Sequence, residues 1–87
     1  MAWINCTVNE GCFPDEVIAG IETNGGRKHL FVQEGKIRQQ QNNWQLEVQV
    51  LPEKIFNTPN MRRVVLPSKP IEGGAVVEVD ESALAVG

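Results

Sequence analysis

Residues 16–33 constrain the fold most, because they specify a β-hairpin together with its register. The dipeptide Asn24-Gly25 is a strong two-residue hairpin signal, since both central positions of a type I′ turn need positive φ. Pairing outward from this turn places apolar residues opposite one another, and it places Glu22 opposite Arg27. A shift of one residue would lose both matches. The predicted pairs are Thr23–Gly26, Glu22–Arg27, Ile21–Lys28, Gly20–His29, Ala19–Leu30, Ile18–Phe31 and Val17–Val32.

Alternation of apolar and polar residues predicts further strands on either side of this hairpin. Residues 44–50 alternate fully, and one face carries Trp44, Leu46, Val48 and Val50. Residues 3–8 alternate in the same way, with Ile4, Cys6 and Val8 together. Residues 62–66 form a short run that Pro67 stops, and residues 75–79 place Ala75, Val77 and Val79 on one face. We expect Leu30, Leu46, Val48 and Val77 to be buried. Helical periodicity is absent, and the tail allows one turn with Asp80 as its cap.

A second hairpin is predicted around Asn42-Asn43, which sets Arg38 opposite Glu47 and Ile37 opposite Val48. Its turn signal is weaker, because residues 38–43 also fit a longer loop. Residues 52–61 and 67–74 are predicted to be loops, since prolines interrupt both segments.

Five to six short strands with turns roughly every 8–12 residues predict an all-β fold, either a small SH3-like barrel or a rolled antiparallel sheet. The layout is similar to that of SH3-like barrels, and a likeness of architecture alone implies no function. With 87 residues, the chain (1–87) is expected to be a single small β domain.

Charge and hydropathy restrict the cellular context. The first ten residues have neither a basic region nor a long apolar stretch, and no apolar run approaches the roughly 18–20 residues of a membrane span. We therefore expect a cytoplasmic protein without a membrane contact. The net charge of −3 disfavours broad binding to phosphate backbones.

The cysteines Cys6 and Cys12 are interpreted as ordinary thiols. Structural zinc usually has four ligands with cysteines in closely spaced pairs, whereas this chain has two cysteines six residues apart and a single histidine, His29. A chain without a secretory signal normally keeps its thiols reduced. We expect no metal, no cofactor and no disulfide, with Cys6 a small buried hydrophobe on the inner face of its strand.

The sequence offers few sets of residues that could form a catalytic site. Asp15 and Glu16 are adjacent, but neighbouring side chains of a strand point to opposite faces. The one nucleophile–base pair to consider is Cys12 with His29, and it requires the two side chains to meet in space. We expect that the chain is not an enzyme, and an enzyme using Cys12 and His29 is the least favoured alternative.

The candidate partner-binding residues are Ile18, His29 and Phe31, which share the outward face of the first hairpin. Gly20 leaves a gap beside them. Two interpretations stay open. Either the chain covers the two large apolar side chains, with Phe13, Leu84 or Val86 as the cover, or they form an exposed patch that binds a protein partner or a second copy of the chain. The predicted function is a non-catalytic protein-interaction module.

The alternative function is binding of single-stranded nucleic acid. In this case Phe31, His29 and Trp44 would stack on bases, and the phosphates would contact Arg27, Lys28, Arg38, Arg62 and Arg63. Glu22 and Glu47 are predicted to neutralise two of these arginines, and the net charge is negative. Binding to a protein partner is therefore favoured over binding to nucleic acid.

Overall fold

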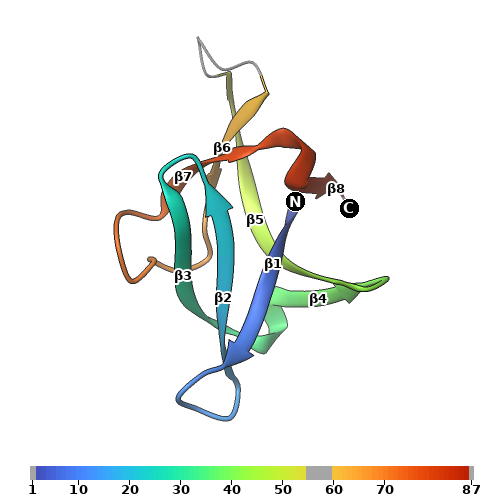
Figure 1. Ribbon diagram of the computed structural model, residues 1–87, viewed down its shortest axis with the longest axis vertical. Coiled ribbons are helices and arrows are strands. Elements are labelled where there is room, and N and C mark those ends of the chain that lie inside the picture. The colour runs from blue at the N-terminus through green and yellow to red at the C-terminus, as the bar shows by residue number, and fades with distance from the viewer. Residues whose placement is uncertain (1, 55–59, 87) are drawn as a thin grey trace.

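The computed structural model describes residues 2–54 and 60–86, and nearly all of them lie in antiparallel strands or the short turns between them (Figure 1). The elements follow one another as β1 (Ala2–Glu10), β2 (Glu16–Thr23), β3 (Gly26–Gln33), the 3-10 turn η1 (Glu34–Lys36), β4 (Ile37–Gln40), β5 (Asn43–Lys54), β6 (Met61–Val65), β7 (Val76–Asp80), the 3-10 turn η2 (Glu81–Ala83) and β8 (Leu84–Val86).

The strands form one curled sheet, a half-barrel with the order β3-β2-β1-β5-β6-β7, in which β4 pairs with β5 and β8 pairs with β1. The tip of the β2–β3 hairpin reaches β7, where the Asn24 backbone N–H donates to the Glu78 carbonyl over 2.8 Å. The prediction of an all-β fold, a small barrel or rolled antiparallel sheet, is confirmed. No helix among the described residues is long and apolar enough to cross a membrane.

The first hairpin has the predicted register at every pair from Val17–Val32 to Thr23–Gly26. The predicted type I′ turn is wrong, because neither Asn24 nor Gly25 has positive φ, whereas Gly26 has a φ of 104°. The second glycine after Asn24 makes this possible. A left-handed glycine that follows a type I turn forms a G1 bulge, which is another common way to close a hairpin.

The second hairpin is shifted by two residues from its predicted register. Its turn is Gln41-Asn42, with Gln41 at a φ of 56°, and Arg38 lies opposite Gln45 instead of Glu47. Because strand side chains alternate with a period of two, this shift leaves each side chain on its predicted face. The predicted placement of Glu47 directly opposite Arg38 is therefore wrong, because Gln45 is its cross-strand neighbour.

Two segments beyond the hairpins also differ from expectation. β5 continues through Pro52, where a loop was predicted, and the β5–β6 register is irregular between Val50 and Lys54. Such an irregularity accommodates a proline, which has no N–H for the ladder. Residues 55–59 of that predicted loop lie outside the described residues. In the tail, Asp80 caps η2 by accepting from the Ser82 backbone N–H over 2.9 Å, but the following β8 was not predicted.

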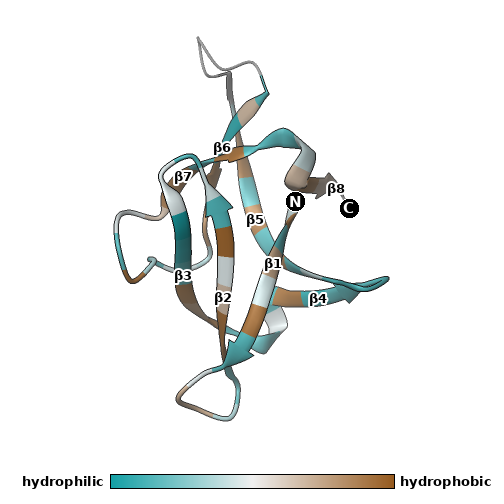
Figure 2. Ribbon diagram, in the orientation of Figure 1, coloured by the Kyte–Doolittle hydropathy of each residue, from teal (hydrophilic) through white to brown (hydrophobic). Residues whose placement is uncertain are grey.

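The core lies on the inner side of the curled sheet, and hydrophobic and polar residues alternate along β1 (Figure 2). The four predicted core residues are all buried: Leu30, Leu46, Val48 and Val77. Trp44 shares the inner face but lies near the start of β5, and its side chain is 41% exposed. On the opposite face Gln45 is buried, a position that the alternation marks as outward.

Candidate functional site

The predicted partner-binding residues lie together on the outer face of β2 and β3. Ile18 and Phe31 are cross-strand partners, and His29 lies two residues before Phe31 on the same face. Phe31 is 36% exposed, His29 is exposed and Ile18 is partly buried. We call these three residues the outer patch.

The outer patch is not covered by the two described candidates. Phe13 is itself 69% exposed, and Leu84 packs against the core. For the third candidate, Val86, the structure describes the backbone only.

The loop between β6 and β7 binds the outer backbone edge of β3 instead. The Ser68 hydroxyl donates to the Phe31 carbonyl over 2.6 Å, and the Ile71 backbone N–H donates to the His29 carbonyl over 2.9 Å. These bonds occupy backbone groups that a further strand would otherwise pair with. They leave the Ile71 side chain 64% exposed beside the patch.

The gap at Gly20 is filled by Arg27. The guanidinium of Arg27 crosses β2, donates to the Thr7 hydroxyl over 2.6 Å and pairs with Glu22. A Cβ at Gly20 would lie 2.6 Å from the Thr7 hydroxyl oxygen and 3.1 Å from Arg27 Nη2. The contacts with Thr7 and Glu22 thus hold the side chain of Arg27 across β2.

The candidate nucleic-acid-binding residues do not gather on one surface. Arg27 and Lys28 are consecutive on β3 and point to opposite faces, Arg38 is on β4, and Arg62 and Arg63 are consecutive on β6. Arg63 is paired with Glu78, with 3.5 Å between Nε and Oε2.

The proposed base-stacking residues are separated as well. The pairing places Trp44 opposite Cys6 on the inner face of the sheet, whereas Phe31, opposite Ile18, belongs to the outer face. The two rings do not form a common platform for successive bases.

Arg38 is part of a polar network on the outer face. Its Nε donates to Gln45 Oε1 over 2.8 Å, and Gln45 Nε2 donates to Asn5 Oδ1 over 3.3 Å. The guanidinium carbon lies 4.3 Å from the centre of the Trp3 ring, a cation–π contact. This network explains why Gln45 is buried on the nominally outward face.

The cysteines are separate free thiols. Cys6 is half-buried in β1 against the core, and burial raises the pKa of its thiol to about 11. Cys12 is exposed, and its backbone N–H donates to Glu16 Oε1 over 3.2 Å. The described residues contain no group of three or more His, Cys, Asp or Glu side chains that could hold a metal ion.

The register also places Cys12 away from His29. Glu16, which Cys12 contacts, lies opposite Gln33. Gln33 and His29 are four residues apart on β3, about 13 Å at roughly 3.3 Å per residue. A nucleophile and its base must be within hydrogen-bond reach, so the hairpin does not assemble this pair.

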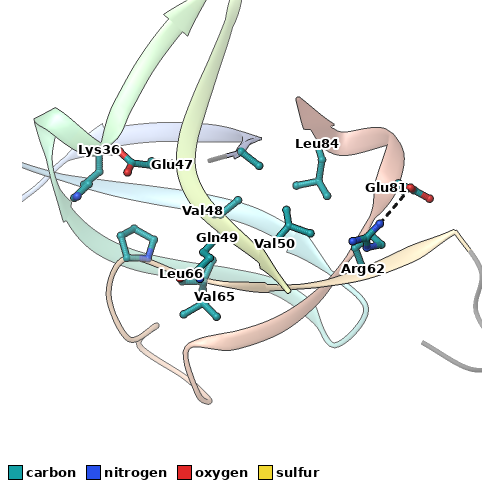
Figure 3. A pocket seen from close by; sticks show the side chains of 12 residues that line it. Lys36, Glu47, Val48, Gln49, Val50, Arg62, Val65, Leu66, Glu81 and Leu84 are labelled. Atoms are coloured by element: carbon teal, nitrogen blue, oxygen red, sulfur yellow. Dashed lines mark ion pairs between the residues drawn. The ribbon is translucent and has the colours of Figure 1, made fainter. Parts of the chain in front are cut away.

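A groove of about 930 Å³ crosses β5. Lys36 and Glu47 lie toward one end, and Arg62 and Glu81 toward the other (Figure 3). The apolar side chains that line it are Ala2, Val48, Val50, Val65, Leu66, Pro67 and Leu84.

Arg62 is a partly buried polar group at one end of this groove. Its Nη2 donates to the Leu51 carbonyl over 3.2 Å, and its Nη1 lies 3.8 Å from Glu81 Oε1, beyond hydrogen-bond distance. Its Nε is buried and has no acceptor among the described residues. A guanidinium carries five N–H donors, and among the described residues one of them has an acceptor within hydrogen-bond distance.

Sequence reasoning missed the groove because its residues come from distant parts of the chain. Residues of β1, β5, β6, η2 and β8 meet there, and β8 itself was not predicted. Arg62 was singled out, but only as a contact for phosphate.

Scans against protein-family models, curated proteins and solved structures found no match for this chain. The function is therefore inferred from the groove and the outer patch.

Proposed function

We propose that this chain is a non-catalytic protein-interaction module that binds a segment of a partner protein in the groove across β5. The observation that carries the proposal is the groove itself, which has an apolar floor between two charged ends. Concave apolar surfaces with a few placed polar groups are typical binding sites. Its apolar residues come from β1, β5, β6 and β8.

The outer patch is our second candidate surface for the same function. The 36% exposure of Phe31 supports it, together with the exposed Ile71 side chain beside it. Exposed apolar side chains that cluster on one face are typical of contact surfaces.

We further propose that the domain is an SH3-like barrel and acts in the cytoplasm. The curled sheet of short antiparallel strands supports the first proposal. The two unpaired thiols support the second, because a reducing compartment keeps cysteines in this form.

The experiment is selection of peptides from a random library displayed as an internal insert, so that no peptide has a free end. We expect peptides to be enriched on the wild-type protein and to lose binding to Gln49→Trp, because the indole would fill the groove at an exposed position of β5. Gln33→Trp is the matched control, since Gln33 is exposed on β3 outside the groove. Fluorescence polarisation measures both affinities. No enriched peptide, or equal binding to both variants, would contradict the proposal.

A further inference from the structure

We infer that the groove recognises an acidic side chain next to an apolar one in an extended partner segment, and that Arg62 binds the carboxylate. This inference rests on the proposed function and names the chemistry of its partner. It starts from Nη1 of Arg62, whose ion pair with Glu81 is loose at 3.8 Å. The neighbouring Nε is buried without an acceptor among the described residues, so the carboxylate would bind at Nη1.

The surroundings of Arg62 make an added carboxylate favourable. The arginine side chain is 25% exposed, so its charge is partly removed from water. A carboxylate that hydrogen-bonds a guanidinium in such a setting forms one of the stronger polar contacts that proteins make. Glu81 is poorly suited to this role, because its oxygen stays 3.8 Å away and its side chain is 54% exposed.

The apolar neighbour follows from the position of Arg62 at one end of the groove floor. Val50 and Leu84 lie between Arg62 and the opposite end, and both pack against the core while still lining the groove (Figure 3). An apolar side chain on Val50 and Leu84 would shield the new ion pair from water. The groove continues beyond them to Lys36 and Glu47, which favours a segment that runs through it over a chain end that stops at Arg62.

The peptides enriched from the internally inserted library test this directly. We expect them to share an Asp or Glu beside an apolar residue, and we expect Asp→Asn or Glu→Gln in the peptide to weaken binding to the wild-type protein at least tenfold. Arg62→Gln should weaken the acidic peptide to a similar extent and remove most of the salt dependence of its affinity. The peptide substitution keeps the test valid where Arg62→Gln fails to fold.

Three controls on the protein locate the contact. Arg63→Gln alters the neighbouring arginine, which pairs with Glu78 and does not line the groove, and it should leave the affinity unchanged. Lys36→Gln at the opposite end should weaken the acidic peptide less than Arg62→Gln does. Glu81→Gln should tighten the acidic peptide several-fold, because it removes the competing carboxylate beside Arg62.

The possible failures are distinguishable. Enriched peptides without an acidic residue, or acidic peptides that depend on Lys36 and not on Arg62, would overturn the inference and leave the groove as a binding site. A second library with free C-termini, binding more tightly through its terminal carboxylate, would overturn the assignment to a side chain. If neither library yields a peptide, the proposed function fails together with the inference.

Discussion

At the scale of single residues, Gly20 shows how a missing side chain organises a sheet surface. Arg27 crosses β2 over this glycine to reach Thr7. We expect Gly20→Ala to lower the free energy of unfolding by about 1–2 kcal/mol, because the new Cβ would displace Thr7 or Arg27. Gly35→Ala is the control, since a Cβ there meets nothing within 4 Å, and its effect should stay within about 0.5 kcal/mol. Urea unfolding measures both, and equal values would contradict the assignment.

Burial of the Cys6 thiol predicts a dependence of stability on alkaline pH. The pKa of this thiol is raised from 9.0 to about 11, so the folded chain retains a proton in this interval that the unfolded chain has lost. The unfolded state then binds fewer protons, and the free energy of unfolding falls as the pH rises from about 9 to about 11. Urea titrations across this range should show a shallower fall for Cys6→Ala. Identical slopes for the two proteins would show that the thiol is not desolvated.

The two thiols should also differ in reactivity. Near pH 8 the exposed Cys12 should react with a thiol reagent well before Cys6, because the thiolate is the reacting species and burial disfavours it. Two thiols should react after denaturation of protein purified without reductant and shielded from air. A count of zero would mean a disulfide, and released zinc would mean a metal site.

At the scale of secondary-structure elements, β7 offers a test of the inward and outward faces within one strand. Val79 is fully buried, whereas Val76 is 54% exposed. Val79→Ala should cost about 1–3 kcal/mol through lost burial and a residual cavity, and Val76→Ala should stay within about 0.5 kcal/mol. Chemical denaturation of the two variants gives the comparison. A larger loss for Val76→Ala would reverse the assignment of the faces.

The hairpins show where the sequence suffices to predict an element and where it does not. The register of β2 and β3 was predictable, because apolar and charged pairs between neighbouring segments allow only one alignment. The Gln and Asn run before β5 carries no such pattern. The observed alignment there matches the network of Arg38, Gln45 and Asn5, and Asn5 lies on β1, far away in the chain. The three residues of β8 are too few for any periodicity to mark them as a strand.

At the scale of the whole molecule, the outer patch bears on self-association. Phe31→Asp should lower the free energy of unfolding by less than about 1 kcal/mol, because the ring is partly exposed, and it should abolish any contact made through the patch. Phe13→Asp is the control, since Phe13 is more exposed and lies in the loop before β2. Thermal melting and light scattering give stability and mass. If Phe31→Asp gave a strongly destabilised monomer, Phe31 would be assigned to the core and the outer patch would be excluded as a contact surface.

The candidate site was less predictable than the fold for a physical reason. Strands follow from local alternation, whereas the groove depends on how the sheet curls and on which distant strands then face each other. The residues of the outer patch were predictable because a single hairpin holds them. Arg62 and Leu84 come together only after β8 has paired with β1.

This last pairing sets Ala2 opposite Val86, so the two ends of the described chain leave the sheet side by side (Figure 1). Neighbouring strands are about 4.8 Å apart, and a few flexible residues would join such ends without strain. A circular permutant opened between Gln41 and Asn42 would then retain every strand pair of the sheet. For the same reason the fold would fit as an insertion within a surface loop of a host protein, spreading the two stems of that loop by little more than the width of one strand pair.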